Sequence, residues 1–338
     1  MKKILFAMAA LLGCATVGFA QNNYVATLQH EGAFTHYYGS GALTSAYNAA
    51  AEGDTITLSP GTFSSPGTIN KGITLRGTGI SAAAKSYVSG NVTFCSTDST
   101  RVTIVEGVRF SNSCYIQNNA SGGERGQGKI KLIKDFIDNG IYFNTASNYS
   151  TVKGPEVRIY NNIIWNRFAF YANSYPDVFV YNSDVSDTYS DTGFAQTTSA
   201  YINCIIYYGY YYTYYTTTNQ NFYNCIFVFP SSNSYQLSSS NTCRNCLSVN
   251  NTQLFANQMY GGNNWTNANR SEVFSTGYVL TDEAKEKYIG TDGTEIGYYG
   301  GSYPYNTKVQ YPIVTNFSSD VQTSKEGILN INVEVDGQ

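Results

Sequence analysis

Asparagine recurs at a fixed spacing of 21 residues through the middle of this 338-residue chain. Each copy lies in a short apolar stretch such as IYNNII or FYNCIF, and the five positions are Asn161, Asn182, Asn203, Asn224 and Asn245. Toward the N-terminus we expect the column to continue through Lys134, Glu106 and Arg76, at longer steps of 27, 28 and 30 residues. A fixed period of this length indicates stacked structural repeats.

Apolar residues alternate with polar ones on both sides of each asparagine. The position two residues earlier holds Ile159, Val180, Tyr201 and Phe222, and the position two residues later holds Ile163, Ile205, Ile226 and Leu247. A period of two predicts β-strands rather than helices. Strands that stack once per repeat form a parallel solenoid, whose crossovers are right-handed. The sequence therefore predicts an all-β fold: a single-stranded right-handed parallel β-helix with rungs of about 21 residues.

The asparagine column has a structural explanation. Asparagine tolerates the left-handed backbone that tight turns need, and its side-chain amide can bond to the amides on neighbouring rungs as a ladder. A row of asparagines that binds a ligand is the alternative. The next position along the chain is predicted to form a second, inward-facing ladder of small residues, composed of Gly107, Asp135, Asn162, Ser183, Cys204, Cys225 and Cys246.

The first twenty residues are typical of a signal peptide. Lys2 and Lys3 precede a short apolar core, and small residues stand before a cleavage site after Ala20. A lipoprotein anchored at Cys14 is the alternative. We therefore expect a secreted, periplasmic or cell-surface protein. No later segment is apolar enough to cross a membrane, and a net charge of −3 without a basic patch argues against nucleic acid as a partner.

Six cysteines remain after the signal peptide, at Cys95, Cys114, Cys204, Cys225, Cys243 and Cys246. Export permits disulfides, and the rung spacing allows a bridge between neighbours in the inner ladder; the pairing stays open. The last two cysteines form a CxxC, but no second CxxC or nearby histidine accompanies it, so we predict no metal site there.

Residues 39–76 carry a recognisable motif, GSGALTSAYNAAAEGDTITLSPGTFSSPGTINKGITLR. This stretch resembles the opening of the pectate-lyase-like right-handed parallel β-helix superfamily, and the resemblance extends over about residues 40–250. It implies a short capping helix at about residues 42–51 that covers the end of the core, followed by the first rung. The resemblance is specific for the fold but weak for function, because the superfamily holds lyases, hydrolases, esterases and adhesins.

The end of the chain suggests how the solenoid closes. The segment IGTDGTEIGYYGGSYPY (289–305) resembles the closing segment of uncharacterised β-helix proteins from Bacteroidetes-like bacteria. We therefore predict a signal peptide at 1–20 and a β-helix domain at 21–305. Within that domain, regular rungs span about 73–250 and a closing segment spans 251–305. Residues 306–338 are predicted to form a tail with a linker and two short strands, PIVTNF and ILNINVEV.

The catalytic motifs of the superfamily's enzymes are missing from the sequence. The chain has no GHG and no WxDH, and Asp135-Phe136-Ile137 only slightly resembles the DFIFG of pectin methylesterases. If the chain is an enzyme, a polysaccharide lyase or glycoside hydrolase, the repeat alignment gathers Asp138, Arg167 and Asp187 on one face as candidate acid–base residues. A surface cluster of ion pairs is the alternative.

No cofactor is identified, although a lyase would use Ca²⁺. The carboxylates of Asp184, Asp187 and Asp191 could bind such an ion, with ordinary turn formation as the alternative.

Seven tyrosines crowd residues 207–215. Alternate members of a strand point outward, and aromatic rings bind sugar rings or apolar partners. We predict an exposed platform of Tyr208, Tyr210, Tyr212 and Tyr214, with Tyr171 on a nearby rung. The leading hypothesis is therefore a β-helix that binds a polysaccharide, a cell-surface glycan or a partner protein. A divergent lyase or hydrolase and a structural or adhesive solenoid are the alternatives.

Overall fold

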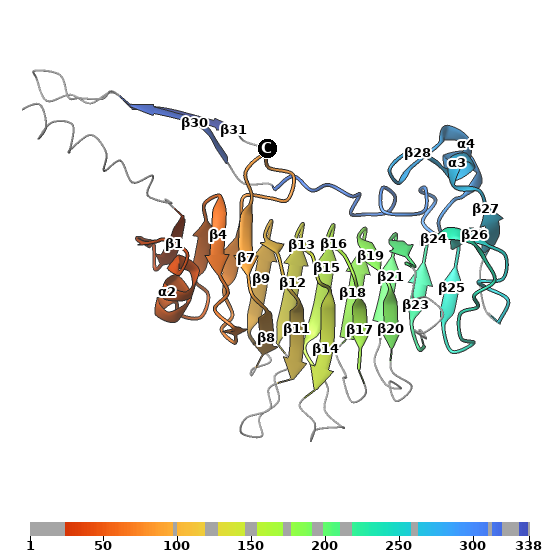
Figure 1. The fold of residues 1–338 in the computed structure, drawn as a ribbon, viewed down its shortest axis with the longest axis horizontal. Coiled ribbons are helices and arrows are strands. Elements are labelled where there is room, and N and C mark those ends of the chain that lie inside the picture. Colours follow the sequence, from red (N-terminus) through yellow and green to blue (C-terminus); the bar gives the residue numbers. More distant parts are fainter. Residues whose placement is uncertain are drawn as a thin grey trace, which may run out of the picture.

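The computed structural model of the chain describes residues 24–96, 100–118, 128–145, 154–171, 177–190, 199–209, 218–257, 263–309, 313–319 and 331–336. The predicted signal peptide, its cleavage site and Cys14 lie outside these residues. The described part is mostly β-structure, arranged in long parallel sheets (Figure 1). None of its helices is long and apolar enough to span a membrane.

Three sheets contain almost all of the strands. Sheet A has the order β2 (Ala33–Tyr38), β1 (Val25–His30), β3 (Thr55–Leu58), β6 (Thr74–Arg76), β9 (Val102–Glu106), β12 (Lys129–Ile133), β15 (Glu156–Tyr160), β18 (Asp177–Tyr181), β21 (Ser199–Ile202), β23 (Asn221–Tyr223), β25 (Thr242–Arg244). Its pairs are parallel from β3 onward, while the β1–β2 hairpin adds to β3 antiparallel.

Sheets B and C are parallel throughout. Sheet B has the order β27 (Trp265–Ala268), β26 (Leu247–Asn251), β24 (Ile226–Asn233), β22 (Ile205–Tyr207), β19 (Asp184–Ser186), β16 (Ile163–Ile164), β13 (Phe136–Ile137), β10 (Arg109–Phe110), β7 (Ser86–Ser89), β4 (Gly61–Ser64). Sheet C has the order β20 (Thr188–Ser190), β17 (Phe168–Phe170), β14 (Ile141–Thr145), β11 (Cys114–Asn118), β8 (Val92–Ser96), β5 (Thr68–Ile69). From β6 to β20 the chain visits A, B and C in turn, and each strand pairs with its equivalent in the next repeat. This is the solenoid-like repeat that the 21-residue period predicts.

The asparagine column occupies the turn between sheets A and B. Strand register aligns the residues just before the five asparagines, from Tyr160 to Arg244. All five asparagines have a left-handed backbone, with φ between 46° and 58°. The prediction that they occupy equivalent turns is therefore confirmed. In this conformation a Cβ crowds the following carbonyl, and asparagine is among the residues that tolerate it best.

The column is misaligned by one residue in the earliest turns of the predicted repeat. Glu106 pairs in register with Ile133 on one side and with Arg76 on the other, so Glu106 and Arg76 belong to strands and not to the turn. Gly107 takes the left-handed position instead, with a φ of 70°, and Lys134 follows it with a φ of 56°. Glycine needs no side-chain interaction to adopt this backbone, which is why no polar residue marks the turn.

The second column faces inward and is buried, as predicted, from Asp135 onward. Its polar members bond to backbone amides of neighbouring rungs: Val108 N donates to Asp135 Oδ1, Asp135 N donates to Asn162 Oδ1, and Asn162 N donates to Ser183 Oγ. In the later rungs Cys204, Cys225 and Cys246 take this place as free thiols that donate to backbone carbonyls.

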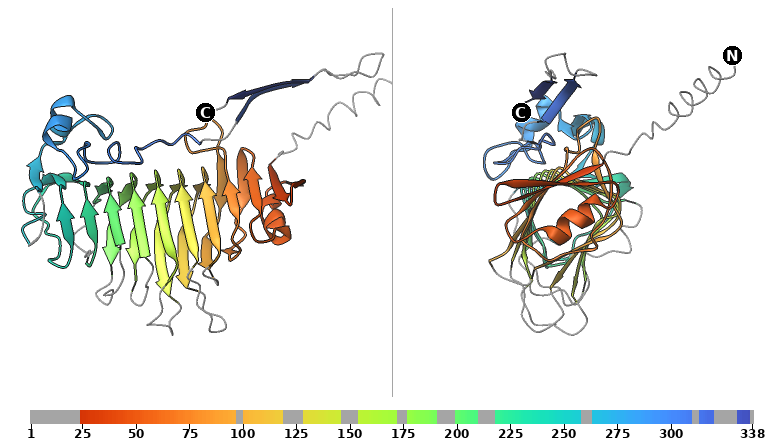
Figure 2. Two further views of the ribbon diagram at one scale, coloured as in Figure 1. Left: turned by 180° about the vertical axis from the view of Figure 1, so that it is seen from behind. Right: turned by 90° about the vertical axis from the view of Figure 1, so that its left-hand side faces the viewer.

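A short helix covers the N-terminal end of the core. Helix α2 spans Ala42–Ala49, close to the predicted range, and lies across the end of the three sheets (Figure 2). It buries Leu43, Ala46 and Tyr47. At the other end of the chain β30 (Ile313–Ser319) and β31 (Ile331–Asp336) pair antiparallel, where the sequence predicts two short strands.

Residues 289–309, named here the return segment, run back along the solenoid over the asparagine column (Figures 1 and 2). The order of contacts is reversed relative to the repeats. Asn245 Nδ2 donates to Ile289 O, Asn224 Oδ1 accepts from Thr291 N, and Asn203 Nδ2 donates to Glu295 O. Further on, Asn182 bonds to Tyr298 and Gly300, Asn161 bonds to Tyr303 and Asn306, and Lys134 bonds to Lys308.

These contacts correct the predicted amide ladder. Among the described residues, one pair of neighbouring asparagines is bonded directly, Asn224 Nδ2 to Asn203 Oδ1 at 3.4 Å. The other amides bind the backbone of the return segment, because that backbone offers carbonyls and amides in an extended row. The asparagine column is thus a surface on which the return segment of the same chain docks.

A second apolar cluster lies on the outer face of sheet B. The residues two positions after the asparagines point outward, and Ile205, Ile226 and Leu247 are buried there beneath residues 273–298. The covering part contains α3 (Arg270–Val273), β28 (Phe274–Thr276), β29 (Val279–Leu280) and α4 (Asp282–Lys287). The inner core instead receives the next residues, Ile164, Ile206 and Phe227.

We predict that Asn182→Gly lowers the free energy of unfolding by about 1–3 kcal/mol, because two carbonyls of the return segment lose a buried donor. Glycine keeps the left-handed backbone, so the loss reports the amide alone. Asn182→Ala should cost roughly 1 kcal/mol more. Urea unfolding measures both. The control is Asn166→Gly, at another left-handed asparagine that is exposed; equal stability of the two glycine variants would contradict the docking role.

Candidate functional site

The tyrosine platform is not present as predicted. Tyr208 is only 1% exposed and belongs to the core. Its ring stacks on Phe229 at 5.2 Å and on Phe227 at 6.3 Å, and its hydroxyl bonds to Thr188 Oγ1 at 2.7 Å. The side chains alternate along β22 and beyond it, so Tyr207 points outward like Ile205, and Tyr208 points inward like Ile206. The prediction for Tyr208 is therefore wrong, and Tyr210, Tyr212 and Tyr214 lie outside the described residues.

Tyr171 is half-buried and belongs to a row of stacked rings along sheet C. It stacks on Tyr142 with centroids 6.2 Å apart, and Tyr142 stacks on Tyr115 at 5.4 Å. Burial raises the pKa of Tyr142 above its usual value. The rings recur once per rung, and each ring of the row stacks on its neighbour.

The candidate acid–base residues are held by different partners. Arg109 donates two hydrogen bonds to the Asp138 carboxylate, Nε to Oδ2 at 3.2 Å and a terminal nitrogen to Oδ1 at 3.0 Å. Asp187 has a left-handed backbone and accepts from Gly209 N at 2.6 Å. Burial raises the pKa of Asp187, while the Gly209 bond and the charge of Arg167 lower it. The charge of Arg167 thus acts to lower the pKa of Asp187, whereas Asp138 forms an ion pair with Arg109.

Asp138 lines a groove on the outer face of sheet B. The groove has a volume of about 450 Å³, and its lining combines acids, amides and aromatic rings: Asp138, Trp165, Asn166, Asp184, Ser186, Tyr207 and Tyr278. The first six come from consecutive rungs, while Tyr278 comes from the C-terminal part that covers the sheet. Trp165 is 50% exposed and packs edge-on against Phe136, at 4.6 Å between ring centroids.

Asp184 is the titratable group most affected by this groove. Burial alone raises its pKa to about 7, and its charge would raise the pKa of Tyr278, Tyr298 and Tyr305 nearby. The groove therefore combines one carboxylate paired with Arg109 and one carboxyl that titrates near neutral pH. Such an arrangement can donate and accept hydrogen bonds from neighbouring hydroxyl groups.

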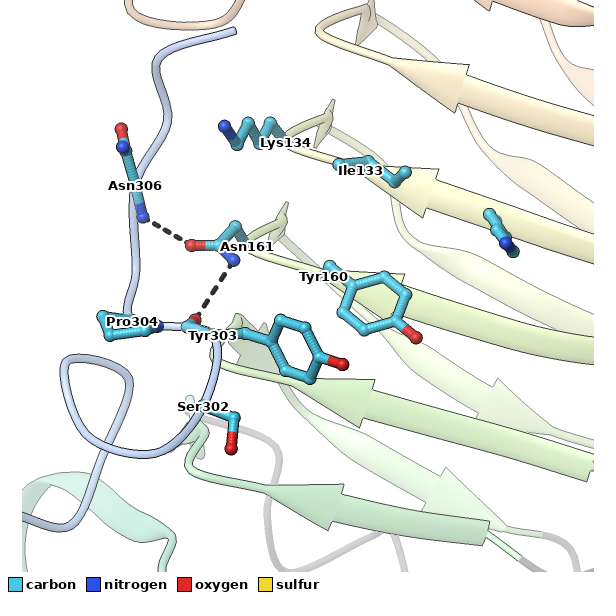
Figure 3. A pocket seen from close by; sticks show the side chains of 9 residues that line it. Ile133, Lys134, Tyr160, Asn161, Ser302, Tyr303, Pro304 and Asn306 are labelled. Atoms are coloured by element: carbon cyan, nitrogen blue, oxygen red, sulfur yellow. Dashed lines mark hydrogen bonds between the residues drawn. The ribbon is translucent and has the colours of Figure 1, made fainter. Parts of the chain in front are cut away.

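A second hollow lies on sheet A, on the other side of the return segment (Figure 3). Its volume is about 460 Å³, and its lining is Lys131, Ile133, Lys134, Tyr160, Asn161, Ser302, Tyr303, Pro304 and Asn306. Asn161 fixes the far wall, because its amide donates to Tyr303 O at 3.3 Å and its carbonyl accepts from Asn306 N. Burial lowers the pKa of Lys134, and Glu106 opposes that shift.

The buried thiols in the described part of the chain differ in their pKa. Burial raises the pKa of the Cys114 and Cys225 thiols well above the usual value, which disfavours the nucleophilic thiolate. Burial also acts to raise the pKa of Cys246, but hydrogen bonds with the Cys225 and Cys243 thiols outweigh it and lower that pKa. Within the described ranges, no group of three or more His, Cys, Asp or Glu side chains is placed to hold a metal ion. Asp191, one of the three aspartates considered for calcium, lies outside those ranges.

The comparisons with known proteins add no family to this geometry. No protein-family model matches the chain, and no curated protein matches it. Five groove residues were not predicted as site residues from the sequence: Trp165, Asn166, Ser186, Tyr207 and Tyr278. The sequence offers a sign for Trp165, because tryptophan occurs only twice in the chain and this one stands at an outward position of its rung. Tyr278 could not be found from the sequence, because it lies outside the repeats and no spacing relates it to sheet B.

We predict that Tyr208→Ala lowers the free energy of unfolding by about 3–5 kcal/mol, since it leaves a cavity between stacked core rings. Trp165→Ala should cost about 1 kcal/mol or less, because its ring is half-exposed and loses mainly one edge contact. Urea denaturation of both variants separates core from surface rings. Similar losses for the two variants would show that Trp165 is a packing residue and weaken its assignment to the groove.

We predict that Asp184→Asn becomes more stable than the natural protein as the pH rises. The folded state holds the Asp184 proton with a pKa of about 7, against an ordinary 3.8, so the natural protein loses stability between these two values. At pH 7 and above, the accumulated difference should be about 3–4 kcal/mol. Denaturation at pH 4, 5.5, 7 and 8 measures it; a difference that stays constant across this range would contradict the burial of Asp184.

Proposed function

We propose that the three sheets form a single right-handed parallel β-helix of a secreted or cell-surface protein, and that its groove on sheet B binds carbohydrate. The repeated order of sheets A, B and C supports the helix, since parallel crossovers are right-handed in nearly all proteins. The opening motif of residues 39–76, with α2 at its start, supports a place in the pectate-lyase-like superfamily. The N-terminal sequence supports export.

One observation carries the binding proposal: the half-exposed Trp165 ring opens into a groove with two tyrosines and several polar groups. Sugar rings have an apolar face that packs on aromatic rings and hydroxyls that need hydrogen-bond partners. Tyr207 and Tyr278 supply further rings and hydroxyls, and Asn166 and Ser186 supply neutral donors and acceptors. The lining thus resembles the mixed surface that carbohydrate recognition needs.

A glycoside hydrolase is the second candidate, and the two carboxyl groups favour it. Asp184, half-protonated near pH 7, could act as the general acid, and Asp138, paired with Arg109, as the base or charge stabiliser. Asp184 is in register with Phe136, two residues before Asp138, and one strand lies between them, so the Cα atoms of the two aspartates lie roughly 11–12 Å apart. Inverting enzymes place their carboxyl groups about 6.5–9.5 Å apart, which leaves room for the attacking water; the two side chains would have to lean toward each other across the groove to reach that separation.

We predict that Trp165→Ala weakens binding to a glycan ligand by roughly tenfold, because one ring-to-sugar contact contributes about 1–1.5 kcal/mol. An array of neutral and acidic glycans identifies the ligand, and calorimetry measures the affinity. Trp265→Ala is the control, since that ring packs on Tyr288 outside the groove. Binding that is unaffected by Trp165→Ala would overturn the assignment of this groove.

The same protein samples decide between binding and hydrolysis. Release of reducing ends from the bound glycan, lost in both Asp184→Asn and Asp138→Asn, would identify an enzyme. Binding without release over hours, with both variants still folded, would leave the carbohydrate-binding function alone.

A further inference from the structure

The hollow on sheet A, between Lys131 and the return segment, has a fixed shape. Its outer wall is residues 302–306, tied to the turn by both polar atoms of the Asn161 amide (Figure 3). Its floor is the outer face of β12 and β15, which supply Lys131 and Tyr160. The volume of about 460 Å³ lies within the range of small-ligand sites. The wall does not have to close on a ligand, because the chain's own hydrogen bonds hold it.

Lys131 and Lys134 bring positive charge to this hollow, and among the described residues a carboxylate, that of Glu106, acts on Lys134. Lys131 lies directly opposite Arg158 in the strand register, and like charges in that position repel. Glu156 is already bound by Arg158, at 2.7 Å from Nε, and Glu106 faces Arg76 at 3.9 Å. Among the residues that the structure describes, no carboxylate is paired with Lys131. An anion bound here would relieve the repulsion.

Aromatic rings border the same space. Tyr160 stacks on Tyr181 with centroids 4.9 Å apart and planes 7° apart, and Tyr303 packs edge-on against both. Tyr303 is 50% exposed. Because Tyr160 and Tyr181 already stack on each other, a ligand ring can contact one aromatic face and cannot be sandwiched. A pyranose, apolar on its ring face and polar at its edge, fits such a one-sided contact.

We infer that this hollow is a second ligand site, which binds a sugar unit bearing a sulfate or carboxylate group, with Lys131 at the anion and Tyr303 against the ring. The site lies on sheet A, and it stands or falls independently of the groove on sheet B. The net charge of the chain is −3, so general attraction of the protein to polyanions does not account for such binding.

Three dextrans with one backbone test the site: dextran sulfate, carboxymethyl dextran and unmodified dextran. We expect the natural protein to bind at least one charged dextran and to bind the neutral one at least tenfold more weakly, in biolayer interferometry at 50 and 300 mM salt. Lys131→Gln should weaken binding of the charged dextran about tenfold or more, and Lys131→Arg should retain it. The sulfated and carboxymethylated forms tell which anionic group the site prefers.

Lys129→Gln is the matched control, since Lys129 lies on the same strand and is exposed outside the hollow. It should leave the affinity within about twofold. Tyr303→Ala should weaken binding several-fold, while the protein stays folded and its melting temperature falls by only a few degrees, because the ring loses two edge contacts. Equal losses for Lys131→Gln and Lys129→Gln, equal binding of neutral and charged dextran, or no binding of either charged dextran would each overturn the inference.

Discussion

The left-handed turn between sheets A and B is the constraint on which the rest of the structure depends. Each repeat from β9 to β25 has a residue with positive φ there, and glycine or asparagine meets that need at the lowest cost. Glycine at this turn would offer no side chain to bind the return segment. Asparagine at five successive turns instead presents a row of amides, which hold the return segment by hydrogen bonds to its backbone.

The C-terminal part of the chain in turn shapes both hollows. On the sheet B side Tyr278 lines the groove, and Tyr298 and Tyr305 of the return segment pack nearby, among the residues that cover the outer apolar column. On the sheet A side its Tyr303 and Asn306 form the wall opposite Lys131. A solenoid face alone is nearly flat, because every rung repeats the one before. The segment that docks on the asparagine row adds the relief that a ligand site requires.

The sequence predicts the regular part of this molecule well and the site only in part. The 21-residue period identifies the turns, because left-handed residues recur in register, and the GDTI motif locates the capping helix. The face of the tyrosines could not be predicted, since the left-handed turn at Asn203 shifts the alternation of inside and outside by one residue. Tyr201 is in the core before this turn and Cys204, Ile206 and Tyr208 are in the core after it, while Tyr207 lines the groove. The partners of the asparagine row could not be predicted either, because the return segment has no repeat in its sequence that would align it with the rungs.

Because charged residues are scarce in this chain, the few ionisable groups at the two hollows determine which sugars each hollow would select. Charged residues make up only 13% of the chain, so the surface around each hollow is largely hydroxyl, amide and aromatic. A surface of that kind contacts many sugars with similar energy, because stacking and neutral hydrogen bonds discriminate weakly among them. Selectivity then depends on the isolated groups: the paired Asp138 and the neutral-range Asp184 on one face, and the uncompensated Lys131 on the other. The two faces are therefore suited to different sugars, even though the C-terminal part of the chain contributes to both.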